Sequence, residues 1–192
     1  MKRIFTHLAT VAALTAGPAF AGDWTLDNDA SRLAFGSIKK NIIGEVHSFE
    51  SMSGSVSADG LAQIQIDLGS VETNIDIRNE RMGKHVFKLA PSATISAQLE
   101  TDQLDALATG DSTVMDVEAV LTLLGVDTEF YTELFVMRAS DDKVIVTTND
   151  MIFLTTEDLE IDQGIDTLKE LAELPSITRA APVTLRFVFT QS

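Results

Sequence analysis

Alternation of apolar and polar residues is the feature that most limits how this chain can fold. In the segment 62–68, Ala62, Ile64, Ile66 and Leu68 alternate with polar residues, and segments further along repeat the pattern. A period of two places one side-chain set on each face of a strand. Eight strands are predicted, the weaker ones included: Leu33–Phe35, Phe49–Ser57, Ala62–Leu68, Ala93–Leu99, Met115–Leu123, Glu129–Arg138, Lys143–Thr155 and Val183–Phe189.

Two segments break this alternation and predict short helices. Apolar residues recur at helical spacing in Ile75–Leu89 and again in Asp166–Leu174, where Asp166 is the expected N-cap and Pro175 ends the helix. The chain is therefore expected to be all-β with one or two short helices, as a small barrel or a two-sheet sandwich. The alternation fits a filled interior and a hollow one equally well.

The first 21 residues have the three parts of a secretory signal peptide. Met1-Lys2-Arg3 is basic, Ile4–Gly17 is mostly apolar, and Ala19-Phe20-Ala21 forms a cleavage site. Cleavage would remove two of the 14 basic residues and none of the 29 acidic ones, changing the net charge from −15 to −17. We expect an exported protein, in a bacterial periplasm, whose residues 22–192 form a single domain.

Composition excludes several functions. The chain has no cysteine, which removes thiol catalysis and cysteine-ligated metals. Its strong acidity argues against nucleic acid as a partner, because phosphate binding requires clustered Lys and Arg. No segment after the signal peptide is long and apolar enough for stable membrane insertion.

The sequence contains no recognisable catalytic or metal-binding motif. His47 and His85 are far apart, and the nucleophile elbow, Walker loop and dinucleotide-binding loop are all missing. No metal, no catalytic residue and no cofactor is therefore expected. A lipid hydrolase remains an alternative, and it would need a nucleophile within hydrogen-bond reach of one of these histidines.

One polar cluster stands out on the first predicted helix: Arg78, Asn79, Arg81, Lys84 and His85. Arg78 and Met82 are four residues apart, so Arg78 leans towards the apolar face and needs a partner for its charge. It could hold the polar head of a ligand. Alternatively, it could pair with an internal acid such as Glu72 or Asp76.

The aromatic residues also allow two interpretations. Ten phenylalanines accompany one tyrosine and one tryptophan, and most of them lie on or beside predicted strands. They could fill the barrel, as in a structural or interaction module that binds no ligand. They could instead line an apolar tunnel.

Several short motifs follow one another in a characteristic order and spacing. They are Trp24–Asp27, Ser31–Phe35, Glu45–Phe49, Met52–Val56, Ser70–Asn74, Ile77–Met82, His85–Phe87 and Pro91–Ile95. Together they resemble the YceI-like family of periplasmic polyisoprenoid-binding proteins, and the similarity covers essentially the whole chain after the signal peptide.

The resemblance implies an eight-stranded antiparallel, lipocalin-like barrel that holds an isoprenoid lipid, such as a polyprenyl lipid or a quinone tail, without catalysis. A homodimer is compatible with it, as are transport, stress protection and storage. Inward-facing apolar residues would grip the tail, with the basic residues near its polar end. The expected ligand-binding residues are Phe35, Phe49, Ile64, Ile66, Arg78, Arg81, Met82, His85, Phe87, Ile95, Leu99, Val117, Leu121, Phe130, Leu134, Leu185 and Phe187.

Overall fold

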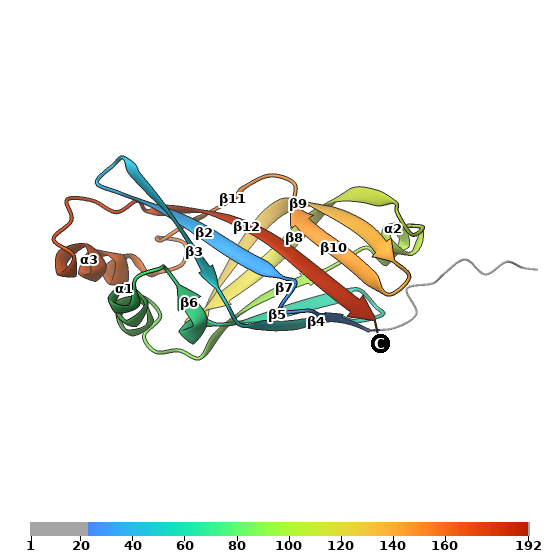
Figure 1. The fold of residues 1–192 in the computed structure, drawn as a ribbon, viewed down its shortest axis with the longest axis horizontal. Helices are drawn as coiled ribbons and strands as arrows, with labels where there is room; N and C mark the ends of the chain where they lie inside the picture. Colours follow the sequence, from blue (N-terminus) through green and yellow to red (C-terminus); the bar gives the residue numbers. More distant parts are fainter. Residues whose placement is uncertain (1–22, 192) are drawn as a thin grey trace, which may run out of the picture.

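The computed structural model describes residues 23–191, whose strands join into one antiparallel sheet (Figure 1). The predicted signal peptide lies outside the described residues. The strands are β1 (Trp24–Leu26), β2 (Arg32–Lys39), β3 (Ile43–Phe49), β4 (Met52–Val56), β5 (Leu61–Asp67), β6 (Val71–Glu72), β7 (Ser92–Gln98), β8 (Ser112–Leu123), β9 (Val126–Ser140), β10 (Lys143–Thr148), β11 (Ile152–Thr155) and β12 (Ala180–Gln191).

The sheet closes on itself because β12 is shared along its length. In its second half, Phe189 pairs with Leu26 of β1 and with Val144 of β10. In its first half, Val183 pairs with Phe35 of β2 and with Ile152 of β11. Since β1 also pairs with β4, the circuit β1-β4-β5-β7-β8-β9-β10-β12 is closed. The predicted eight-stranded antiparallel barrel is confirmed.

Two predicted strands are each divided into two shorter ones. The predicted strand Lys143–Thr155 is β10 followed by β11, because the chain stops pairing with β9 after Thr148. The predicted strand Phe49–Ser57 is the end of β3 followed by β4, with Glu50 and Ser51 between them. There the Glu50 and Ser51 amides donate to the Ser70 hydroxyl at 3.2 and 3.0 Å. This side chain replaces a neighbouring strand as hydrogen-bond acceptor, so the break leaves those backbone donors satisfied.

The helices gather mainly at one end of the barrel, where α1 and α3 lie beside each other (Figure 1). The predicted helix Ile75–Leu89 is confirmed as α1 (Asp76–Arg81) continued by a π-turn, η2 (Met82–Val86). A single 3-10 turn, η1 (Leu68–Ser70), precedes β6. The short helix α2 (Thr101–Asp105), at the opposite end, has no counterpart in the prediction.

The second predicted helix exists but begins earlier than expected. It is α3 (Asp162–Leu171), and its N-cap position is Ile161. The expectation that Asp166 caps it is wrong, because Asp166 lies inside the helix and its carboxylate accepts from Lys169 and Arg179 at 2.9 and 2.6 Å. The apolar residues Ile161 and Leu159 ahead of it are buried, and they extend the packed face of the helix.

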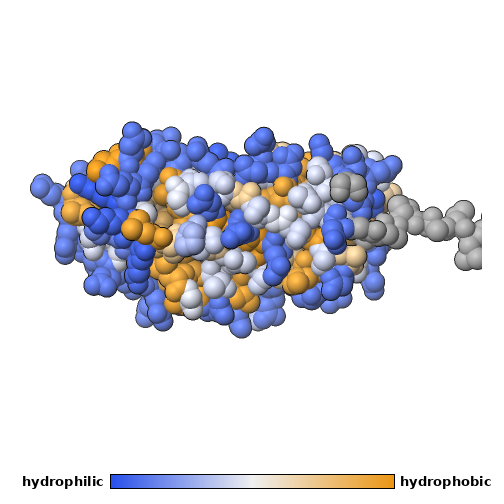
Figure 2. Space-filling view, turned by 90° about the horizontal axis from the view of Figure 1, so that it is seen from below, coloured by the Kyte–Doolittle hydropathy of each residue, from blue (hydrophilic) through white to orange (hydrophobic). Residues whose placement is uncertain are grey.

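The outside of the barrel is mixed in character. Figure 2 shows hydrophilic side chains over much of one face, with apolar patches between them. Within residues 23–191, no helix combines the length and apolar character that a bilayer crossing requires.

Candidate ligand-binding cavity

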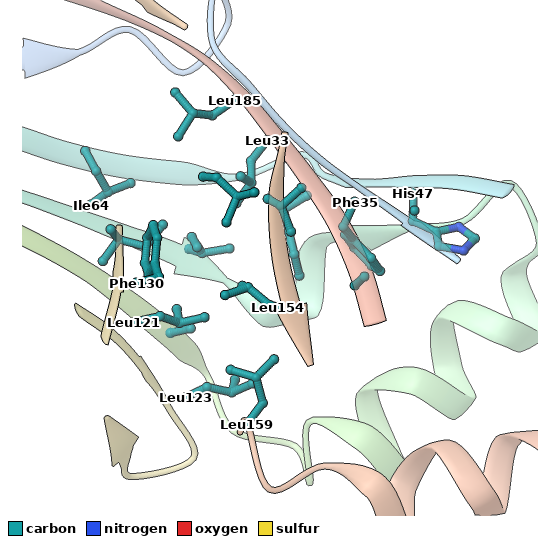
Figure 3. A pocket seen from close by; sticks show the side chains of 18 of the residues that line it. Leu33, Phe35, His47, Ile64, Leu121, Leu123, Phe130, Leu154, Leu159 and Leu185 are labelled. Carbon is teal, nitrogen blue, oxygen red and sulfur yellow. The ribbon is translucent and has the colours of Figure 1, made fainter. Parts of the chain in front are cut away.

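The interior of the barrel holds a cavity of about 560 Å³. This volume falls in the range of about 300–1,000 Å³ that is typical of small-molecule sites. The inward faces of strands all round the barrel line it, together with α1, η2 and α3. Figure 3 shows part of this lining, including Leu33, Ile64, Leu121 and Phe130 directed into the same space. The interior is therefore hollow and mostly apolar.

Sixteen of the 17 residues predicted from sequence line this cavity. They are Phe35, Phe49, Ile64, Ile66, Arg78, Arg81, Met82, Phe87, Ile95, Leu99, Val117, Leu121, Phe130, Leu134, Leu185 and Phe187. The structure does not bring His85 to the cavity. In a regular α-helix, His85 would follow Arg78 and Met82 on one face, but the π-turn inserts an extra residue and Val86 takes the inward position.

Aromatic rings in mutual contact line part of the cavity. The centroids of Phe35 and Phe49 are 5.5 Å apart, and those of Phe49 and Phe87 are 5.9 Å apart. These spacings are those of interacting aromatic pairs. The phenylalanines thus pack on one another and still leave the interior open.

A row of alanines on β5, β7 and β8 adds space to the cavity. Ala62 on β5 pairs with Ala97 on β7, which pairs in turn with Ala119 on β8. All three line the cavity. Their single methyl groups leave room that a larger side chain would fill, which the sequence pattern did not indicate.

One end of the cavity is polar. Ser37, Lys39, Glu45 and His47 continue the inner face of the β2–β3 hairpin, and Arg78 reaches them from α1. Apart from Arg78, sequence reasoning did not place these residues in the ligand site. The sequence does contain a pattern that predicts their inward orientation, because Ser37 and Lys39 continue the alternation that begins at Leu33 and Phe35.

Arg78 has an acidic partner, but not either of the acids that the sequence suggested. Its Nη1 donates to Glu45 Oε2 at 2.7 Å, and its Nη2 donates to the carbonyl of Thr73 at 2.5 Å. Lys39 binds the other oxygen of the same carboxylate at 2.7 Å. Glu72 instead accepts from Asn79 at 3.2 Å. Glu45 therefore binds two cations at once.

This ion-pair cluster shifts two pKa values. Burial raises the pKa of the Glu45 carboxyl, but the hydrogen bonds from Arg78 and Lys39 outweigh it and hold the pKa below its usual value. Burial lowers the pKa of His47, and the positive charge of Arg78 lowers it further. At neutral pH the cluster thus contains an ionised Glu45 and a neutral His47.

Acidification is expected to destabilise the protein through His47. The unfolded chain takes up a proton at this residue as the pH falls through about 6.5, whereas the folded chain does not until a lower pH. The loss of stability is therefore negligible well above pH 6.5 and grows as the pH falls through that value. The free energy of unfolding should fall between about pH 7.5 and 5.5, by at most about 1.4 kcal/mol per pH unit.

Urea unfolding at both pH values measures this effect, with His47→Gln as the comparison. The variant should lose the His47 contribution to the pH slope. A slope unchanged by the substitution would contradict the assignment. The contribution of Glu45 belongs to a separate window, because it is present above about pH 4.5 and is lost at lower pH.

His47 also lies within hydrogen-bond reach of a hydroxyl. Its Nε2 is 3.0 Å from Ser37 Oγ, so the distance requirement of the hydrolase alternative is met. A catalytic serine–histidine pair also uses a third group that orients the base. No such group is present within residues 23–191, since His47 Nδ1 has no hydrogen-bond partner and both Glu45 oxygens bind cations.

The cavity opens at the end covered by α1 and α3. Ile75 and Ile77 are among its lining residues and are 43% and 50% exposed. Arg81 links the two helices there, because its guanidinium donates to the carbonyl of Leu171 at 3.1 Å. The polar cluster therefore lies near the mouth, and the apolar interior extends behind it. Among residues 23–191, no group of acidic or histidine side chains is arranged to hold a metal ion.

Comparison with known proteins gives a consistent family match. Residues 24–167 match the YceI-like domain. A polyisoprenoid binding domain from Saccharophagus degradans, implicated in plant cell wall breakdown, is 36% identical, with a TM-score of 0.86 over 88% of this chain and 98% of that chain. A search of curated proteins found no match.

Two more distant structures share the fold. Burkholderia cenocepacia BcnA is 18% identical, with a TM-score of 0.65 over 85% of this chain and 98% of its own. The Campylobacter jejuni YCEI protein is 14% identical, with a TM-score of 0.56 over 76% of this chain and 84% of its own.

Proposed function

The chain belongs to the YceI-like family, and from this premise we propose that it binds a long isoprenoid lipid inside its barrel. The observation that carries the proposal is the apolar cavity of about 560 Å³, open beside α1. The polyisoprenoid binding domain at 36% identity supports the same class of ligand. Under this proposal the 16 lining residues predicted from sequence, Phe35 and Leu185 among them, contact the lipid.

Burial of the tail supplies enough free energy for tight binding. Each isoprene unit contributes roughly 3–4 kcal/mol before entropic costs, at about 0.8 kcal/mol per buried carbon. Five or six units would reach the practical limit of about 20 kcal/mol for non-covalent binding. A lipid in this cavity should therefore remain bound through purification.

Organic extraction of the purified protein, followed by mass spectrometry, tests the proposal. Protein produced with its own signal peptide should yield about one prenyl lipid per chain. Delipidated protein should take up a prenyl lipid from detergent micelles. Failure of both experiments would contradict the proposal and would favour a barrel that binds no ligand. The hollow interior argues against that alternative, because a purely structural barrel would fill its core to native density.

The Ser37–His47 contact gives the hydrolase alternative a specific test. We expect no cleavage of prenyl esters above background, because no carboxylate orients His47. The Ser37→Ala variant should leave the lipid content within about twofold of wild type. Ester turnover that disappears in Ser37→Ala would reverse this conclusion.

We also propose that the protein is exported to the periplasm, with its signal peptide cleaved after Ala21 and residues 22–192 acting as one domain. A homodimer is part of the same proposal. Mass spectrometry of the secreted chain and light scattering would test these points.

A further inference from the structure

We propose that the lipid enters and leaves the barrel sideways, through a seam between β9 and β11. The seam is bordered on one side by the first half of β9, residues 126–133, and on the other by β11, Ile152–Thr155. This inference rests on the proposed function, because it concerns the route by which the lipid reaches the cavity. It assigns β11 as the edge of the barrel that moves to let the chain pass.

The strands that border the seam are paired with their outer neighbours and not with each other. The first half of β9 pairs with β8, and β9 pairs with β10 only from Leu134 onwards. β11 pairs with β12, where Ile152 lies opposite Val183. Among residues 23–191, no backbone hydrogen bond joins residues 126–132 to residues 152–155. The seam is therefore an interruption in the hydrogen-bonded wall of the barrel.

The cavity reaches this interruption from the inside. Phe130 and Thr132 on β9 line the cavity, and so do Ile152 and Leu154 on β11. Figure 3 shows Phe130 and Leu154 directed into the same space. Alternate residues of an antiparallel strand direct their N–H and C=O groups to the same side, so those of β9 that face away from β8 point into the seam. Such groups need water when they have no protein partner, so the seam borders both solvent and the apolar interior.

Side chains close the seam at its two ends. At one end the Thr128 hydroxyl donates to the carbonyl of Asp158 at 3.1 Å. At the other end, Asn149 donates to Glu133 from its backbone amide at 2.9 Å and from its side chain at 2.8 Å. The stretch of β9 between these contacts is about 17 Å long, at about 3.4 Å per strand residue. Loss of the single Thr128 hydrogen bond would therefore release one end of the seam while the other stays tied.

The mouth beside α1 is tied together more firmly than the seam. Glu45 binds both Lys39 and Arg78 there, and Arg81 of α1 donates to a carbonyl of α3. α3 also packs closely on η2, since a Cβ atom on Gly164 would lie 2.5 Å from a backbone oxygen. A long tail that entered at the mouth would have to be threaded end-first along the barrel. The seam instead admits the chain along its length and requires fewer contacts to break.

β11 presents apolar side chains on both of its faces. Ile152 and Leu154 line the cavity, whereas Phe153 between them is 64% exposed. Met151, just before the strand, is 54% exposed. A prenyl chain that passes β11 would therefore contact apolar surface outside the barrel as well as inside, which keeps part of the chain out of water during the passage.

A disulfide across the seam tests the inference, and it can form in only one way because the chain has no cysteine of its own. Delipidated protein carrying Thr128→Cys and Asp158→Cys takes up geranylgeraniol from phosphatidylcholine vesicles, and uptake and release are timed before and after oxidation. Oxidation should slow both rates at least tenfold with the final occupancy unchanged, and reduction should restore them. The matched control carries Gln63→Cys and Ser96→Cys, which join opposite residues of the paired strands β5 and β7. Its oxidation should change either rate less than twofold.

Thr128→Val supplies a second arm that needs no disulfide. It removes the hydrogen bond to Asp158, so release should become three- to tenfold faster, with occupancy unchanged because Thr128 does not line the cavity. The control Thr122→Val removes a hydrogen bond to Asp127, 2.6 Å long, between the paired strands β8 and β9. Release from this control should stay within twofold of wild type.

Two results would each overturn the inference. One is a disulfide, verified by mass spectrometry, that leaves uptake and release unchanged. The other is release from Thr128→Val that matches release from Thr122→Val. Failure of wild-type protein to take up the probe at all would instead overturn the proposed function, because occupancy at equilibrium does not depend on the route of entry.

Discussion

The Ala119→Phe variant is expected to lose at least nine-tenths of its bound lipid while keeping its fold. Ala119 lies on the inner face of β8, is 4% exposed and borders the cavity. Its cross-strand neighbours are Ala97 and Phe130. A phenyl ring at this position would project into the cavity beside the alanine row, where it would occupy space that a prenyl tail needs.

The barrel should tolerate this ring because the cavity accommodates it. Overpacking usually costs about 1–3 kcal/mol where the surroundings are already dense, but here the added atoms enter open volume and bury apolar surface. We therefore expect a melting temperature of the lipid-free protein equal to or above that of lipid-free wild type.

Val120→Phe is the matched control for this experiment. Val120 is the next residue on β8, does not line the cavity, and pairs with Ser96 and Glu129. Extraction and mass spectrometry of this variant should give the wild-type lipid content. If Ala119→Phe retained the full lipid content, the lipid would have to lie outside the barrel.

Most of the fold could be predicted because the barrel repeats one simple rule. In each strand of the barrel, the alternation of apolar and polar residues identifies the side chains that point to the interior, as in Ile64–Ile66 and Leu185–Phe187. This alternation does not predict the residue at which a strand leaves one neighbouring strand and pairs with another. The pairing of β12 with β2 and β11 in one half, and with β1 and β10 in the other, depends on contacts between residues far apart in the chain.

The alternation of apolar and polar residues also explains which part of the cavity could be predicted from the sequence. Its apolar lining followed from alternation, but its polar end did not. Glu45 and Arg78 are 33 residues apart in sequence, and polar residues on a strand resemble a solvent-exposed face until the structure shows what covers them. The misplacement of His85 has a local cause, since a π-turn changes the helical period over only five residues and leaves no clear mark in the sequence.

The Gly164→Ala variant is expected to be destabilised by about 2–3 kcal/mol, which corresponds to a fall of roughly 5–10 °C in melting temperature. Gly164 is a buried residue of α3 that packs against η2. A Cβ atom there would lie 2.5 Å from the carbonyl oxygen of His85 and 2.8 Å from the Cα of Val86. Because both contacts are with backbone, α3 would have to move away from η2, disturbing Ile165 and Leu168, which line the cavity near its mouth.

Gly83→Ala separates this close contact from the general effect of removing a glycine from a helix. Gly83 lies in η2, and a Cβ atom added there would have no neighbour within 4 Å, so the variant should be as stable as wild type or up to about 1 kcal/mol more stable. Thermal unfolding and lipid content should be measured for both variants. If Gly164→Ala matched Gly83→Ala in both measurements, the packing of α3 on η2 would contribute neither to the stability of the barrel nor to the retention of lipid. The expected result is a loss of both in Gly164→Ala alone, because α3 supplies part of the wall that holds the tail.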